Sequence, residues 1–158
     1  MKKSLVAYFS ASGITAKVAQ GLAHAIGADT FEICPQNPYT QADLNWADRS
    51  SRSSVEMRDP ACRPPLKNSV PDVQDYEVVF VGFPVWWYRE PSIIDTFVEA
   101  CNWNGQTIVP FATSTSSGLG ESRQHLQALA PKTTVKEGKR FDAAVTENEL
   151  ARWAQSVL

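Results

Sequence analysis

Three hydroxyl side chains and a glycine gather in the short segment "SASGIT", residues 10–15. The segment follows an apolar run and precedes a helical pattern, so the hydroxyls of Ser10, Ser12 and Thr15 converge beside backbone N–H groups at a helix N-terminus. Gly13 lets a bound group approach the backbone closely. The arrangement predicts a cradle for a dianionic phosphate. The alternative is a serine-rich turn that only caps the helix.

The sequence patterns for nucleoside triphosphates and for dinucleotides do not occur in this chain. A triphosphate site needs G-x-x-x-x-G-K-[ST], with a lysine for the outer phosphates, and no such string is present. A dinucleotide site needs three glycines after the first strand, whereas "SGLGES", residues 117–122, has two and follows a later strand. The segment 10–15 contains no Lys or Arg. NTPase chemistry is therefore disfavoured.

Three adjacent aromatic residues, Trp86, Trp87 and Tyr88, follow the apolar run at 78–81. The run is typical of a buried strand, so the aromatics fall where the chain surfaces as a loop. Each of them can bury a large apolar area, and leaving all three in water would be costly. They need a flat or apolar partner, which is either a ligand or the protein core.

Four more side chains are candidates for roles near such a site, each with a simpler alternative. His125 could donate a proton to a substrate, or it is an exposed helical histidine; His24 is expected to be solvated. Arg89 and Arg123 could attract an anionic acceptor, or they are lone surface charges. Trp46 could fold over the site as a lid, or it anchors a surface helix.

These residues must be positioned by an alternation of strands and helices. Strands are predicted at 4–9, 29–34, 76–83, 106–113 and 133–141, and helices at 15–26, 91–101, 119–130 and from Thr146 onward, where Thr146 and Glu149 have capping-box spacing. The third and fourth strands are continuously apolar, as strands covered on both faces must be. The pattern predicts an α/β fold, a doubly wound parallel sheet with helices on both sides.

Residues 35–72 interrupt this alternation between the second and third strands. They are rich in Pro, Ser, Asn and Arg, with a possible short helix within residues 41–57 that ends at Asp59-Pro60. A stretch of this length inside a compact domain is usually a functional lid or a mobile excursion.

Length and composition set the broad class of the protein. With 158 residues, 43% of them hydrophobic, the chain fits a single domain over 1–158. The 15 basic and 17 acidic residues give a formal net charge of -2, which argues against a nucleic-acid partner or a membrane-binding basic patch.

The cysteines and the start of the chain bear on where the protein is located. The three cysteines, Cys34, Cys62 and Cys101, are odd in number and lack metal-ligand spacing, which favours reduced thiols, a cytoplasmic protein and no metal site. The start "MKKSLVAYF" resembles a weak secretory signal, but its apolar run is short and is better interpreted as a first strand.

Three segments of the chain resemble a known family. "YFSASGITAKVAQGLA" is similar to the phosphate loop and first helix of flavodoxins, which have the form [ST]-x-[ST]-G-x-T. "PVWWYREPSIIDTFVE" and "TIVPFATSTSSGLGES" resemble the second and third signature segments of a bacterial flavodoxin-like branch with P-[IV]-W-W in its second loop. The resemblance implies a three-layer sandwich around a five-stranded parallel sheet in the order 2-1-3-4-5. In this fold, for which flavodoxins are the usual example, FMN binds at the switch between strands one and three.

The resemblance also implies FMN as cofactor and a set of residues that bind it, with no catalytic residue of the chain's own. The phosphate falls to the segment 10–16, the ring to the segment 84–88, and the polar ring edge to the loop 113–120. The implied residues are Ser10, Ser12, Gly13, Ile14, Thr15, Ala16, Pro84, Val85, Trp86, Trp87, Tyr88, Thr113, Ser114, Ser117 and Gly118. Relatives often have Gly directly after the Trp pair, whereas this chain has Tyr88, for which positive φ is unfavourable.

Three functions follow from the sequence. The first is an FMN-binding electron-transfer protein that works between a redox partner protein and an acceptor. The second is an FMN-dependent NAD(P)H:quinone or related reductase acting on a small-molecule acceptor, which predicts a cavity roofed by residues 40–60. The third is a cofactor-free interaction module, in which "SASGIT" only caps a helix and the aromatics pack internally.

Overall fold

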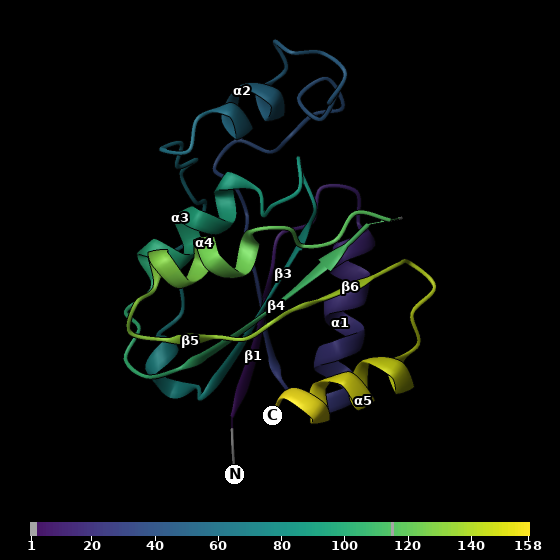
Figure 1. Ribbon diagram of the computed structural model, residues 1–158, viewed down its shortest axis with the longest axis vertical. Coiled ribbons are helices and arrows are strands. Elements are labelled where there is room, and N and C mark those ends of the chain that lie inside the picture. The colour runs from purple at the N-terminus through teal and green to yellow at the C-terminus, as the bar shows by residue number, and fades with distance from the viewer. Residues whose placement is uncertain (1–2, 115) are drawn as a thin grey trace.

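The strands form one sheet between two layers of helices in the computed structural model, which describes residues 3–114 and 116–158 (Figure 1). The first two residues of the lysine-containing start, and Thr115 within the predicted loop 113–120, lie outside the described residues. The elements are β1 (Ser4–Tyr8), α1 (Ile14–Ile26), β2 (Asp29–Glu32), α2 (Arg52–Arg58), the 3₁₀ turn η1 (Val73–Asp75), β3 (Val78–Pro84), α3 (Ser92–Ala100), β4 (Thr107–Thr113), α4 (Ser122–Leu129), β5 (Thr134–Val135), β6 (Lys139–Phe141) and α5 (Glu147–Val157).

The sheet confirms the predicted flavodoxin-like α/β fold. Its strands are parallel in the order β2-β1-β3-β4-β5, and β6 also pairs with β4. The centre of the sheet is β3, which runs beside β1 from Ser4↔Val78 to Tyr8↔Gly82 and beside β4 from Val78↔Thr107 to Pro84↔Thr113. The carboxyl ends of β1, β3 and β4 therefore meet at one edge.

The predicted final strand, 133–141, was wrong as a single element, because it forms two short strands. The amide of Lys136 donates to the carbonyl of Ile108, at 2.9 Å, so Ile108 faces this side of β4. Two residues further along, Pro110 faces the same side and has no N–H to donate. The ladder breaks there and resumes with Lys139 opposite Phe111.

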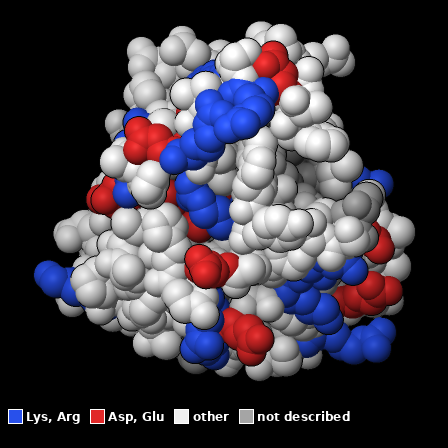
Figure 2. Space-filling view, turned by 45° about the horizontal axis from the view of Figure 1, so that its top comes forward, with Lys and Arg blue, Asp and Glu red and all other residues white. Residues whose placement is uncertain are grey.

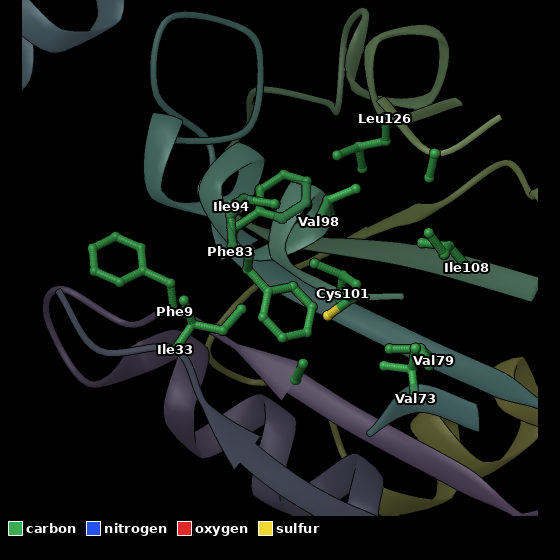
Figure 3. Packing of buried hydrophobic residues seen from close by; sticks show 14 of the residues in the cluster. Phe9, Ile33, Val73, Val79, Phe83, Ile94, Val98, Cys101, Ile108 and Leu126 are labelled. Atoms are coloured by element: carbon green, nitrogen blue, oxygen red, sulfur yellow. The ribbon is translucent and has the colours of Figure 1, made fainter. Parts of the chain in front are cut away.

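Two apolar cores cover the two faces of the sheet. One packs under α3 and α4, and Figure 3 shows Phe83 of β3 beneath Ile94 and Val98 of α3. The other packs under α1 and α5, where Trp153 lies edge-on to Phe111 of β4. Both faces of β3 are buried, which explains its continuous apolar run.

Two helix boundaries differ from the sequence prediction. The possible helix within 41–57 is confined to α2, and it ends at Asp59 before Pro60 as predicted. The helix predicted at 119–130 begins only at Ser122, because Gly120 has φ 58, outside the right-handed helical region. At the last helix, the Thr146 hydroxyl accepts from the Glu149 amide at 3.2 Å, which confirms half of the predicted capping box. None of the helices in the described part of the chain has the length and apolar character that crossing a bilayer requires.

Candidate functional site

Three loops leave the carboxyl edge of the sheet next to one another. The first loop (9–13) follows β1, the second loop (85–91) follows β3, and the third loop (114–121) follows β4. Because β1 and β3 are neighbours, and α1 and α3 cover opposite faces, the strand order reverses between the first and second loops. Such a switch point is where open α/β sheets bind ligands.

The first loop is held by its own side chain and opens onto a bare helix N-terminus. The Ser10 hydroxyl accepts a hydrogen bond from the Gly13 amide at 3.1 Å, and Gly13 adopts φ 93. No side chain caps α1, whose first turn has no acidic residue. The backbone N–H groups of Ile14, Thr15 and Ala16 are therefore available to an anion, and the helix dipole adds to their attraction. Ser12 is exposed at the same place.

A buried hydroxyl pair joins the first helix to the end of β4. Thr15 Oγ1 and Thr113 Oγ1 are 2.7 Å apart, and the two residues are only 2% and 5% exposed. Either oxygen can donate the proton. The contact brings together two residues that are 98 positions apart in the chain, both of which the flavodoxin resemblance assigns to FMN.

The second loop contains a two-residue hairpin turn with left-handed backbone. The Trp86 amide donates to the Arg89 carbonyl at 3.1 Å, and the Arg89 amide donates to the Trp86 carbonyl at 3.2 Å. Trp87 and Tyr88 between them have φ 50 and φ 66. Positive φ is unfavourable for Tyr88, but a type I′ turn, whose signs of φ these residues have, requires it at both central positions. The aromatic pair is thus held in strained backbone.

The three adjacent aromatic side chains have different surroundings. Trp86 turns inward and packs edge-on against Phe9 and Tyr39, with ring centroids 5.6 and 5.3 Å away. Trp87 and Tyr88 remain 44% and 73% exposed. Trp86 thus packs against two neighbouring rings, whereas Trp87 and Tyr88 leave much of their aromatic surface in water.

The third loop lies against the second. The Val85 amide donates to the Thr113 carbonyl at 3.3 Å, and the Ser114 hydroxyl bonds the Ser117 carbonyl. A Cβ at position 120 would collide with the carbonyl oxygen of Tyr88, so Gly120 is needed for the loops to touch. Pro84 ends β3 and Gly118 is exposed nearby. The structure therefore brings together the described residues of all three predicted segments.

A pocket of about 520 Å³ opens between the second loop and residues 35–72, called the excursion below. Its volume is in the usual range for a small-molecule site. Trp46, which is 76% exposed, stands at its rim in a turn and not in a helix. The prediction that Trp46 anchors a surface helix is therefore wrong. The lining residues are Leu44, Trp46, Ser53, Val85, Trp86, Trp87, Tyr88 and Ser117.

The excursion is an ordered unit closed at its base. Pro35 and Leu66 form an antiparallel bridge, flanked by a hydrogen bond from the Lys67 amide to the Cys34 carbonyl at 2.9 Å. Above it, Arg52 lies 3.9 Å over the Tyr39 ring and bonds Glu56 at 3.1 Å and the Asn37 carbonyl at 2.7 Å. These contacts hold α2 to the start of the excursion, and α2 lies above the carboxyl edge of the sheet (Figure 1).

Sequence reasoning missed a buried polar cluster behind the second loop. Glu90 and Asp95 are fully buried, and His125 Nδ1 lies 2.8 Å from Glu90 Oε2. Burial, and then the charge of Glu90, raise the pKa of Asp95 to about 7, while the hydrogen bond to Glu90 raises the pKa of His125. The prediction of an exposed His125 is wrong, because its ring bonds Glu90 and is half-buried. The prediction of Arg89 as a lone charge is also wrong, since it bonds Asp95 at 3.3 Å.

The sequence offered one signal for this cluster. Two acidic residues, Glu90 and Asp95, flank the start of an apolar helix.

The comparisons with known proteins agree with this geometry. The family model for flavodoxin matches residues 3–157. The chain belongs to the flavodoxin family. No curated protein matches this flavodoxin-family chain. Solved structures do. A presumed flavoprotein from Bacteroides uniformis is 40% identical, with a TM-score of 0.92 and 98% of each chain covered.

Two further structures extend this likeness. A presumed flavoprotein from Bacteroides eggerthii is 44% identical to the flavodoxin-family chain, with a TM-score of 0.92, 99% of this chain and 98% of that chain covered. A flavoprotein from Lactobacillus acidophilus, solved in complex with FMN, is 20% identical with a TM-score of 0.72, covering 98% of this chain and 99% of that one. At that identity the last likeness shows the shared fold alone.

Proposed function

We propose that this protein binds FMN at the carboxyl edge of its sheet and transfers electrons through it. The observation that carries the proposal is the contact of 2.7 Å between Thr15 and Thr113, which joins the start of α1 to the end of β4, where the first and third loops meet these elements. Bound FMN would supply one- and two-electron redox chemistry, while the chain supplies affinity, orientation and access. The three free cysteines support a cytoplasmic setting.

The phosphate of FMN fits the start of α1. Uncapped N–H groups of Ile14, Thr15 and Ala16 would donate to its oxygens, and the Ser12 hydroxyl is exposed beside them. Gly13, at φ 93 and with open space where a Cβ would stand, lets the phosphate approach the backbone. The helix dipole compensates for the lack of a basic side chain in this loop.

The flavin ring fits the exposed part of the second loop. Trp87 and Tyr88 present large aromatic surfaces that the protein leaves in water, and a flat ring covering them would remove that apolar area from solvent. Ser117 lines the same pocket and would face the polar edge of the ring. The half-buried Trp86 would support this surface through its contacts with Phe9 and Tyr39.

Binding of FMN and riboflavin to the cofactor-free protein tests the phosphate site. We expect FMN to bind at least tenfold more tightly than riboflavin, and Ser12→Leu to remove that difference. Ser69→Leu, at another exposed serine, is the matched control and should bind FMN like the wild type. Equal affinities for the two flavins, or normal binding by Ser12→Leu, would show that the phosphate assignment is wrong. A colourless protein that ignores FMN would favour the interaction module.

A reductase acting on NAD(P)H and a small acceptor is the second candidate, and the pocket favours it. The reductase hypothesis predicts a cavity roofed by residues 40–60, and Leu44, Trp46 and Ser53 do line one side of the observed pocket. The surface gives less support to a protein partner. In Figure 2, where the end carrying α2 is turned forward, acidic and basic side chains are intermixed, without the single-sign field that steers docking of charged proteins.

An anaerobic titration of the FMN-loaded protein separates the two candidates. Reduction by dithionite in two resolved steps, with no response to NADPH or NADH, would indicate a one-electron carrier. Direct bleaching by NADPH or NADH to the fully reduced form would indicate a reductase. A Trp46→Ala variant would then show whether the rim of the pocket contributes to nicotinamide affinity.

A further inference from the structure

The buried cluster behind the second loop combines three potential metal ligands from three separate elements. Glu90 lies near the end of the second loop, Asp95 lies in the first turn of α3 and His125 lies in α4. One donor atom of each lies within 4.8 Å of the other two. His125 Nδ1 is 2.8 Å from Glu90 Oε2 and 3.5 Å from Asp95 Oδ1. Both carboxylates are 0% exposed.

One oxygen of this cluster lacks a hydrogen-bond partner. Asp95 Oδ1 is buried and has none, although it points toward His125. The other oxygen, Oδ2, accepts from Arg89 Nη1 at 3.3 Å, with Arg63 Nη1 4.0 Å away. A buried carboxylate oxygen without a donor is costly, so the site favours a cation close to Oδ1.

We propose that Glu90, Asp95 and His125 bind a divalent transition-metal ion, with Zn²⁺ as the best match. Metal–ligand bonds of about 2.0–2.1 Å in a tetrahedron place neighbouring ligand atoms about 3.3 Å apart. The distances from His125 Nδ1 to the two carboxylates, 2.8 and 3.5 Å, lie on either side of that value. One imidazole and two carboxylates form a donor set typical of Zn²⁺ or Mn²⁺, not of a thiolate site.

The surroundings of the cluster are suited to a bound ion. The two carboxylates balance the two charges of the metal. Arg89 holds Asp95 by the oxygen that faces away from His125, as outer groups do for metal-ligating carboxylates. A pocket of about 570 Å³ lined by Pro60, Arg89, Glu121, Gln124 and His125 gives solvent access and room for a water ligand. The competing occupant is a proton on His125, which would pair with Glu90 without any metal.

Binding of Zn²⁺ to chelator-treated protein tests the proposal without any flavin. We expect one Zn²⁺ per chain by isothermal titration and elemental analysis, and a rise in Tm with Zn²⁺ concentration. His125→Ala should abolish both the binding of Zn²⁺ and the rise in Tm. Arg89→Lys, which keeps the positive charge but loses the planar guanidinium group, should weaken Zn²⁺ binding about 10–100-fold. His24→Ala is the matched control, because His24 also lies 2.6 Å from a carboxylate, that of Glu147, but is exposed.

Co²⁺ identifies the ligands by absorption spectroscopy. We expect a Co²⁺ spectrum without thiolate charge-transfer bands, lost in His125→Ala and retained in His24→Ala. Glu90→Gln should lower the affinity, and far-UV circular dichroism of each variant shows whether it is folded. No binding, binding that His125→Ala leaves unchanged, or thiolate bands from Cys34 or Cys62 would overturn the proposal and leave the proton as the occupant.

Discussion

Thr15→Val tests whether the hydroxyl contact between the first helix and β4 organises the site. Valine has the shape of threonine without the hydroxyl, so the variant removes one partner of the 2.7 Å contact and leaves the Thr113 hydroxyl buried and alone. An unsatisfied buried hydroxyl costs about 1–3 kcal/mol. We therefore expect the free energy of unfolding of the flavin-free protein to fall by about that amount, and Thr113→Val to behave in the same way.

The double variant decides the matter. Replacing both hydroxyls leaves no unpaired polar group, so Thr15→Val/Thr113→Val should be close to the wild type and more stable than either single variant. Urea unfolding, with equal m values, gives the coupling energy, which we expect to be about 1–3 kcal/mol. Additive effects of the two substitutions would refute the reasoning. FMN affinity should fall in all three variants, since the proposed FMN site loses a hydroxyl in each, from the phosphate segment with Thr15→Val and from the ring edge with Thr113→Val.

Three further predictions concern other parts of the chain. Tyr88→Gly should raise the free energy of unfolding by about 1 kcal/mol in urea, because glycine accepts φ 66 without strain, whereas Tyr88→Ala should give no gain. Gly82→Ala should lower it by about 1–3 kcal/mol, because the new methyl group would collide with the Phe111 ring. Burial, and then a hydrogen bond to a carboxylate, raise the pKa of Tyr76 to about 12, so stability present below pH 10 should be lost as pH rises from about 10 to 12. Urea unfolding at several pH values in that range should show a smaller fall of the free energy of unfolding with pH in Tyr76→Phe than in the wild type.

Local patterns in the sequence are sufficient to predict the buried strands and helices and the position of the phosphate segment between a strand and a helix. The apolar run of β3 and the stripe of α1 mark buried elements whatever the rest of the chain does. The hydroxyls and glycine of 10–15 occur between a strand and a helix, which is sufficient to place them at the carboxyl edge. The flavodoxin resemblance then supplied the order 2-1-3-4-5, which the sheet confirms.

Features that depend on distant contacts could not be predicted in the same way. The pairing of Glu90 with His125 joins residues 35 positions apart, and neither residue has a periodic pattern that signals burial of a charge. The inward turn of Trp86 depends on Tyr39 in the excursion, so the three aromatics looked equivalent in the sequence. The left-handed backbone at Trp87 and Tyr88 goes against the local preference of both residues and is imposed by the closing hydrogen bonds of the turn.

The break opposite Pro110 has a consequence for self-association. An outermost strand exposes unpaired amide and carbonyl groups, and a long flat one is a template on which further chains can add and aggregate. Here one outer strand, β2, has four residues, and the other side is divided into β5 and β6, with two and three residues. Neither side offers a continuous row for another chain to join. Trp46, Trp87 and Tyr88 are exposed apolar side chains that could promote association. The short, divided outer strands do not provide the open sheet edge on which such association could extend into fibres.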